Sequence, residues 1–122
     1  MKNLLLGTLI LSMGLAACSA SAYQKISASK AKDMIDKGNV IIVDVRTQAE
    51  YDEGHIQGAI LIPNETISNQ PPVLLPNKDA VILVYCRSGN RSKQAADKLV
   101  AMGYTKVYDF GGVIDWKYGL VK

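Results

Sequence analysis

A chain of 122 residues, 48% of them hydrophobic, is long enough for one compact domain and too short for two cores of ordinary size. Its net charge of +3 comes from 14 basic and 11 acidic residues. These are spread along the chain, without the basic runs that are typical of proteins that bind nucleic acids or membrane surfaces. The composition therefore predicts a single domain that acts on a small or anionic partner, and no nucleic-acid partner.

Residues 1–22 are predicted to be a signal peptide followed by a short tether. Lys2 supplies a positive charge, residues 4–11 are apolar and small residues follow, which is the order of regions in an export signal. The uncharged stretch turns small and polar after Leu15, so a membrane-spanning helix is the weaker interpretation. We therefore expect export to the bacterial periplasm, with residues 23–122 as the folded domain.

This segment contains two candidate cleavage sites. Residues 15–18, Leu-Ala-Ala-Cys, look like the lipobox of bacterial lipoproteins, while residues 20–22, Ala-Ser-Ala, form an ordinary cleavage motif. The lipobox is favoured as the more specific motif, and it would lipidate Cys18 and tether the domain to the membrane. Under either interpretation Cys86 is the one free thiol of the mature protein, which excludes an internal disulfide.

From residue 23 onward, apolar segments alternate with amphipathic ones, which indicates βα units and a mostly parallel sheet. Strands are predicted at residues 23–27, 40–45, 59–62, 80–85 and 106–110. Helices are predicted at residues 30–37, 47–51 and 92–102, with a last short helix that Gly111 and Gly112 open. Ser29 and Thr47 are the expected N-caps, and Gly38 and Gly103 are expected to end helices. Residues 64–79 are proline-rich and predict a surface connection with at most a short helix.

The most distinctive chemistry lies directly after the predicted strand at residues 80–85. There Cys86 begins a loop that leads to a helix, a position at which open α/β sheets place ligand sites. Inward-facing backbone N–H groups, the helix N-terminus and neighbouring arginines lower the pKa of a cysteine, so Cys86 is the candidate nucleophile. The candidate anion-binding residues are Arg87, Ser88, Gly89, Asn90, Arg91 and Ser92. The alternative is an inert, buried cysteine. The electropositive loop makes this interpretation less favourable, because reactive cysteines are found in such surroundings.

Three segments resemble motifs of the rhodanese family, in particular of its small single-domain periplasmic members. Residues 86–91 are similar to the active-site loop of that family, residues 44–63 to its N-terminal signature and residues 111–116 to its C-terminal signature. The resemblance extends over residues 23–122. It implies a three-layer α/β fold, with a mostly parallel five-stranded sheet and helices on both faces. It also leads us to expect a monomer without a cofactor.

The resemblance further implies a two-step transfer of sulfur. The Cys86 thiolate takes the outer sulfur of a donor such as thiosulfate, sulfite leaves, and the persulfide passes its sulfur to a thiophilic acceptor such as cyanide or a thiol. The loop amides would hold the anionic groups. Arg87 and Arg91 would recruit the dianion, while Asn90 and Ser92 would line the loop and Ser92 could cap the helix.

The other polar residues near these motifs have structural interpretations. Asp44 and Arg46 are supporting candidates, for which an ion pair or a turn-fixing role is the default, for instance Arg46 with Glu50. His55 is expected to have a turn-stabilising or hydrogen-bonding role. A single histidine and a single remaining cysteine are too few ligands for a typical zinc site. Trp116 is expected to pack.

Other functions stay open. A phosphatase or arsenate reductase is disfavoured, because phosphatases of this fold place five residues between cysteine and arginine, whereas four separate Cys86 from Arg91. A non-catalytic binding module is a second alternative, although such domains often lack the cysteine. A third is a carrier that exchanges persulfide sulfur with an exported partner protein.

Overall fold

A computed structural model describes residues 22–122 of the chain. Cys18 and the predicted signal segment, apart from Ala22, lie outside the described residues. Within residues 22–122, no helix is long and apolar enough to cross a membrane.

The described residues form an α/β fold around one parallel sheet, as predicted. Its strands are β1 (Gln24–Lys25), β2 (Ile41–Asp44), β3 (Ile60–Leu61), β4 (Val81–Cys86) and β5 (Lys106–Gly112). They lie in the order β1-β5-β4-β2-β3, and every neighbouring pair is parallel. The middle strand, β4, therefore carries Cys86 to the carboxyl edge of the sheet, between β2 and β5.

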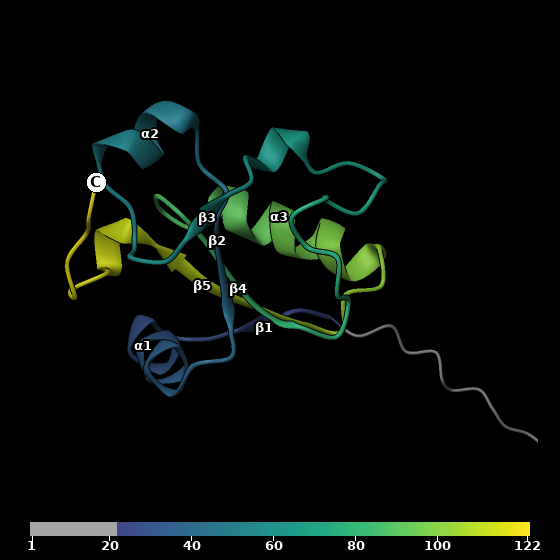
Figure 1. Ribbon diagram of the computed structural model, residues 1–122, viewed down its shortest axis with the longest axis horizontal. Coiled ribbons are helices and arrows are strands. Elements are labelled where there is room, and N and C mark those ends of the chain that lie inside the picture. Colours follow the sequence, from purple (N-terminus) through teal and green to yellow (C-terminus); the bar gives the residue numbers. More distant parts are fainter. Residues whose placement is uncertain (1–21) are drawn as a thin grey trace, which may run out of the picture.

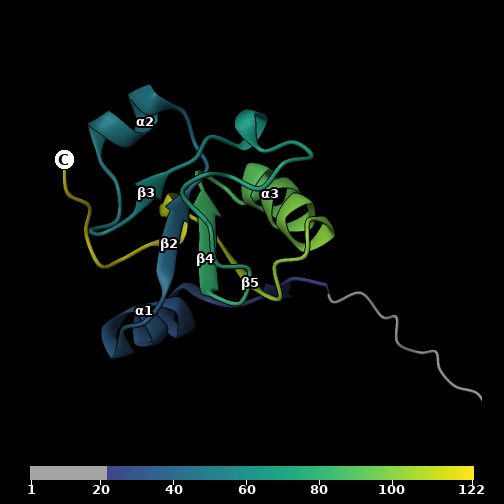
Figure 2. The ribbon, with the colours of Figure 1, turned by 45° about the vertical axis from the view of Figure 1, so that its right-hand side comes forward.

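Helices cover both faces of the sheet, which confirms the expected three layers. Helix α1 (Ala28–Lys37) lies on one face and α3 (Asn90–Ala101) on the other (Figures 1 and 2). Helix α2 (Gln48–Glu53) follows β2, and the short 3₁₀ helices η2 (Asn64–Thr66) and η3 (Val113–Asp115) follow β3 and β5. The connection at residues 64–79 thus contains the one short helix that its composition allowed.

The side chains of β4 alternate between two cores. Ile82, Val84 and Cys86 face α3, whereas Leu83 and Tyr85 face α1. All of these side chains are buried, and each full burial of a large apolar side chain stabilises the fold by about 1.5–3 kcal/mol. A strand covered on both faces needs apolar residues at every position, which explains the uninterrupted apolar run in its sequence.

Helix α1 begins earlier than expected. Its N-cap is Ser27, whose hydroxyl accepts a hydrogen bond from the backbone N–H of Lys30 over 3.0 Å. The assignment of the cap to Ser29 was therefore wrong: Ser27 has the extended backbone that an N-cap requires. The helix ends at Gly38, which has a φ of +85°, as expected.

Helix α3 also begins two residues before the predicted start. Gly89, at a left-handed φ of +106°, occupies the N-cap position, and Asn90 is the first helical residue. Ser92 therefore lies inside the first turn and is fully buried, so the expectation that it could cap the helix was wrong. At its other end the helix stops before Gly103, which has a φ of +99°.

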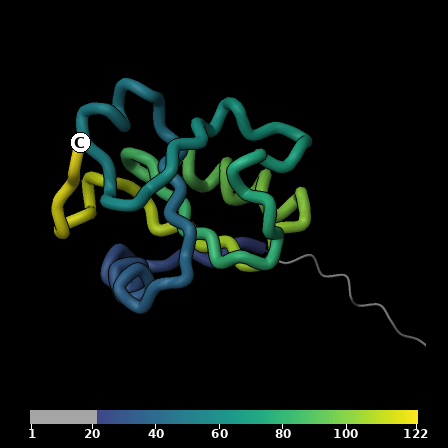
Figure 3. The backbone as a smooth tube through the Cα atoms, viewed as in Figure 1, coloured from purple at the N-terminus to yellow at the C-terminus, as the bar shows by residue number. Residues whose placement is uncertain are grey.

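The carboxyl-terminal part of the chain returns to the turn that follows α2 (Figure 3). Strand β5 runs through Gly111 and Gly112 and is therefore two residues longer than predicted. The predicted last short helix does follow these glycines, because Gly112 is the N-cap of η3 and Trp116 its C-cap. After η3, Val121 forms an antiparallel bridge with His55, in which each backbone N–H donates to the other residue's carbonyl over 2.8 Å. The bridge thereby fixes the end of the chain to the turn that follows α2.

Candidate active site

Cys86 lies beneath the loop that joins β4 to α3. Only 1% of the residue is exposed. The backbone N–H of Gly89 donates a hydrogen bond to its Sγ atom over 3.0 Å, and the Ser92 hydroxyl oxygen lies 3.6 Å from the same atom. The loop thus places hydrogen-bonding groups around the sulfur.

The pKa of the Cys86 thiol is lowered although the residue is buried. Burial by itself raises this pKa, because it disfavours the charged form. The hydrogen bond with the Ser92 side chain and those from the backbone amides of Ser92, Gly89 and Ser88 lower it and outweigh burial. The N-terminus of α3 begins beside the sulfur, and its partial positive charge acts in the same direction. The site therefore favours a nucleophilic thiolate.

Gly112 supports the loop from the neighbouring strand. It lies opposite Cys86 in the register of β4 and β5. A Cβ atom at this position would collide with the carbonyl group of Arg87 and with the backbone nitrogen of Ser88. The backbone N–H of Ile114 also donates to the Arg87 carbonyl over 3.2 Å. The end of β5 therefore fixes the path of the loop, and this close contact requires a residue without a side chain at position 112.

The sequence-based reasoning missed Asp109, a fully buried residue of β5. Its Oδ1 atom accepts hydrogen bonds from the Ser92 hydroxyl over 2.7 Å and from the backbone N–H of Gly111 over 2.9 Å. The signal was present in the sequence, because an aspartate inside an apolar strand needs a partner. The partner could not be read from the sequence, since Ser92 lies 17 residues away.

Of the two loop arginines, only Arg91 is held by an ion pair. Its guanidinium donates to both carboxylate oxygens of Glu50 on α2, over 2.7 and 3.0 Å. This contact lowers the pKa of Glu50 from 4.5 to about 2, together with the bonds from Thr47, although burial acts in the opposite direction. Arg87 is exposed and forms no ion pair within residues 22–122. Ser88 and Asn90 are likewise exposed on the loop.

Asp44 and Arg46 form a buried pair with each other. The guanidinium of Arg46 donates to the Asp44 carboxylate over 2.7 Å and to the carbonyl of Gly54 over 2.7 Å. The Tyr85 hydroxyl donates to the same carboxylate over 2.7 Å. The expected pairing of Arg46 with Glu50 was therefore wrong, whereas the default of an ion pair that fixes a turn agrees with this geometry.

His55 and Trp116 both have packing partners. The His55 ring stacks on Tyr51 with the ring centroids 3.7 Å apart, and its Nδ1 atom lies 2.9 Å from the Tyr51 carbonyl oxygen. The Trp116 ring packs against Phe110 and Tyr118. Among the described residues, no group of three potential ligands is arranged to hold a metal ion.

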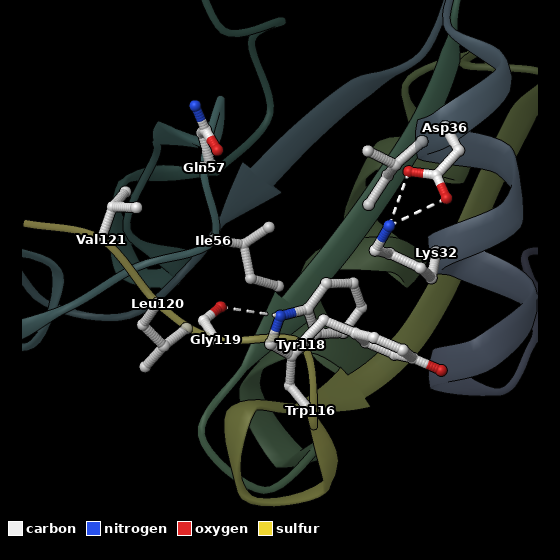
Figure 4. A pocket seen from close by; sticks show the side chains of 10 residues that line it. Lys32, Asp36, Ile56, Gln57, Trp116, Tyr118, Gly119, Leu120 and Val121 are labelled. Atoms are coloured by element: carbon white, nitrogen blue, oxygen red, sulfur yellow. Dashed lines mark hydrogen bonds and ion pairs between the residues drawn. The ribbon is translucent and has the colours of Figure 1, made fainter.

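A separate cavity of about 350 Å³ lies between α1 and the carboxyl-terminal segment (Figure 4). Its walls include Ile56 and Trp116, and the Trp116 indole donates to the Gly119 carbonyl over 3.0 Å. The Lys32–Asp36 ion pair lies at its edge. None of its lining residues belongs to the loop at residues 86–92, so it is not part of the thiol site.

Comparisons with known sequences agree with this geometry. Residues 27–118 match the profile of the family described as Rhodanese-like domain. A sulfurtransferase of Allochromatium vinosum is 38% identical over 98 residues, which are 77% of this chain and 88% of the relative. Thiosulfate sulfurtransferase PspE of Escherichia coli is 40% identical over 73 residues, 60% of this chain and 70% of that protein.

A third relative is much longer than this chain. The tRNA uridine(34) hydroxylase of Photorhabdus laumondii is 33% identical over 96 residues, which are 75% of this chain but 27% of the relative. The chain therefore corresponds to about a quarter of that protein.

Solved structures show the same fold. A rhodanese-like domain protein of Staphylococcus aureus superposes with a TM-score of 0.70 and 33% identity, over 80% of this chain and 96% of that structure. A rhodanese from E. coli, solved with anions, has a TM-score of 0.62 and 38% identity, over 67% and 96% of the two chains. The chain belongs to the rhodanese-like domain family.

Proposed function

We propose that the protein is a thiosulfate sulfurtransferase that carries sulfur as a persulfide on Cys86. The observation that carries the proposal is the buried thiol at the N-terminus of α3, which accepts a hydrogen bond from the Gly89 amide and whose pKa is lowered by its hydrogen bonds. Two relatives that are named as sulfurtransferases support the reaction class.

The first half-reaction is a displacement at sulfur. The Cys86 thiolate attacks the outer sulfur of thiosulfate and a new S–S bond forms. The old S–S bond breaks, and its electron pair leaves with sulfite. The enzyme then holds Cys–S–S⁻, and no external oxidant or reductant is needed.

The second half-reaction returns the thiolate. Cyanide attacks the outer sulfur of the persulfide, thiocyanate departs and the electron pair of the broken S–S bond returns to Cys86. A thiol acceptor reacts in the same way through its thiolate. The amides of Ser88 and Gly89, which favour the thiolate, are placed to stabilise the persulfide anion as preorganised donors.

The same geometry disfavours phosphate-ester chemistry. Four residues separate Cys86 from Arg91, and Arg91 is bound to Glu50. The next position is Ser92, which is fully buried and donates to Asp109. A tetrahedral phosphate would therefore lack the arginine that phosphatases of this fold place at that position.

The proposed enzyme acts in the periplasm and has no nucleic-acid partner. An export signal in residues 1–22 would bring the domain to the periplasm, with Cys18 as a lipid anchor if the lipobox is used. The tRNA hydroxylation named for the longer relative does not suit this chain, because its scattered charge does not favour a nucleic-acid partner.

The proposal is tested by thiosulfate-to-cyanide sulfur transfer with purified protein and its Cys86→Ser variant. We expect thiocyanate formation by the first and none by the second, with both proteins showing the same thermal unfolding. Transfer that persists in Cys86→Ser would overturn the assignment. A stable persulfide with slow turnover would indicate a carrier that serves a partner protein.

A further inference from the structure

Three buried side chains from different elements form a chain of hydrogen-bonding atoms behind the loop. The Sγ atom of Cys86, at the end of β4, lies 3.6 Å from the Ser92 Oγ atom in the first turn of α3. That oxygen lies 2.7 Å from the Oδ1 atom of Asp109 in β5. Cys86 is 1% exposed and the other two residues are not exposed at all. Bulk water is therefore a poor proton acceptor for this thiol.

Ser92 has one hydroxyl proton and several possible acceptors. Its Oγ lies 3.2 Å from the Gly89 carbonyl and 3.3 Å from the Gly111 carbonyl, but only 2.7 Å from the Asp109 carboxylate. A short, charge-assisted bond to the carboxylate is the strongest of the three. With the proton placed there, a lone pair of Oγ is free to accept the S–H of Cys86, so every donor in the chain points toward Asp109.

Asp109 is also the site of an unexplained polar atom. Its Oδ2 is the only buried side-chain nitrogen or oxygen within residues 22–122 that has no hydrogen-bond partner. Burying such an atom without a partner is unfavourable, and it leaves the carboxylate anion less stabilised than one with both oxygens hydrogen-bonded.

Few other ionisable groups face this chain of atoms. Arg91, on the same helix, interacts electrostatically with Cys86, but its guanidinium is paired with Glu50 of α2. Tyr23, which precedes β1, lies near the Asp109 carboxylate, and its pKa is raised by burial, by Asp97 and by Asp109. Neither group stands between the thiol and the carboxylate.

We propose that Asp109 accepts the thiol proton of Cys86 through Ser92. The S–H proton moves to Ser92 Oγ, and the hydroxyl proton of Ser92 moves to Asp109 Oδ1. The products are a thiolate, an intact serine hydroxyl that now donates to sulfur, and a neutral carboxylic acid. The net charge of the buried site does not change, so the step adds no uncompensated charge to a low-dielectric environment. Asp109 and Ser92 are thus positioning residues for the nucleophile.

The proposal rests on Cys86 as the nucleophile of the proposed function, and it makes a distinct prediction about pH. A thiol that loses its proton to solvent loses reactivity about tenfold for each unit of pH below its pKa. A thiol that shares one proton with an internal carboxylate keeps a constant fraction of thiolate over the pH range in which the pair holds that single proton. The rate of Cys86 alkylation by iodoacetamide should therefore level off at acidic pH in the wild-type protein.

Asp109→Asn and Ser92→Ala test this directly, since either substitution interrupts the transfer. We expect the level region to disappear in both, so that alkylation falls about tenfold per pH unit. The matched control is Asp97→Asn, which removes an exposed charge on the same helix and should retain the level region. A level region that survives in Asp109→Asn, or is absent from the wild-type protein, would overturn the proposal.

A measurement on stable protein guards against variants that fail to fold. In the pH range of the level region, infrared spectra of the wild-type protein should contain the carbonyl band of a buried carboxylic acid, and Cys86→Ser should lack it. Identical spectra would refute the internal transfer. Both readouts are independent of sulfur transfer, so a protein that shows the level region without turnover would contradict only the proposed function.

Discussion

At the scale of single residues, the two arginines of the loop have different environments. The guanidinium of Arg91 is held by both carboxylate oxygens of Glu50, whereas Arg87 is exposed and without an ion pair among the described residues. A positive charge that is already paired contributes less to an incoming anion. Arg87 is therefore the better candidate for thiosulfate recruitment, and Arg91 for the link between α2 and α3.

Arg87→Ala is predicted to raise the KM for thiosulfate about tenfold, the effect of one lost charge-assisted hydrogen bond. The free energy of unfolding should stay within about 0.5 kcal/mol of the wild-type value, as for other surface substitutions. Steady-state kinetics and thermal unfolding check both parts. Arg91→Ala is the comparison: unlike Arg87→Ala, it should lower the free energy of unfolding, because it leaves Glu50 without its ion-pair partner. An unchanged KM in Arg87→Ala would exclude Arg87 from donor binding.

Sequence reasoning at this scale singled out Cys86 but not all of the contacts around it. The loop motif pointed to Cys86, because a cysteine between a buried strand and a helix is recognisable locally. It did not reveal that Glu50 pairs with Arg91 across 41 residues, or that Asp109 reaches Ser92. Such contacts depend on the order of strands in the sheet, and short-range spacing carries no information about that order.

At the scale of elements, the path of the loop at residues 86–92 depends on the end of β5. The backbone of Arg87 and Ser88 passes so close to Gly112 that no side chain fits between them. Gly112 has an extended backbone with a φ of −149°, which any residue can adopt. The requirement for glycine here is therefore steric and concerns the loop, not the conformation of the strand.

Gly112→Ala is predicted to displace the loop and to reduce turnover at least about 100-fold, because a misplacement of about 1 Å at a reacting group has an effect of that size. Overpacking should also lower the free energy of unfolding by about 1–3 kcal/mol. Sulfur transfer and denaturant unfolding measure the two effects.

Gly38→Ala is the matched control for this substitution. It also destabilises, since Gly38 has a φ of +85°, but a Cβ there would meet open space far from the loop. The control should lose stability and keep its turnover. Normal turnover in Gly112→Ala would show that the loop does not depend on the close contact.

The types and order of the elements were predictable, but several of their ends were not. An uninterrupted β-branched run identified β2, an uninterrupted apolar run identified β4, and the amphipathic pattern identified α1 and α3. The start of α3 was placed two residues late because its N-cap is Gly89, which has no side chain to signal a cap. The end of β5 was missed because its glycines serve the neighbouring loop, and sequence patterns read glycine as a turn or a break.

At the scale of the whole molecule, the Arg91–Glu50 pair links α2 to the sheet-covering α3. The pKa of Glu50 falls from 4.5 to about 2 on folding, mainly through its hydrogen bonds with Arg91. A depressed carboxyl pKa contributes stability that is present above the unfolded value and is lost as the pH falls through the folded value. The contribution should therefore disappear between about pH 4.5 and pH 2.

Glu50→Gln is predicted to lower the free energy of unfolding at neutral pH by about 1–2 kcal/mol, a figure reduced for the partial exposure of the pair. It should also make unfolding less dependent on pH in the acidic window. Urea unfolding at a series of pH values measures both. Asp36→Asn, which removes an exposed ion pair within α1, is the control and should cost less than about 0.5 kcal/mol. The same acid slope in Glu50→Gln and wild type would contradict this account of Glu50.

The most direct test of the central claim is the intact mass of the protein after exposure to thiosulfate alone, with Cys86→Ser treated in parallel. The account predicts that the wild-type protein gains the mass of a single sulfur atom, that the variant gains nothing, and that cyanide removes the added mass as thiocyanate. A wild-type protein that gains no sulfur, or a variant that gains as much, would contradict a persulfide on Cys86.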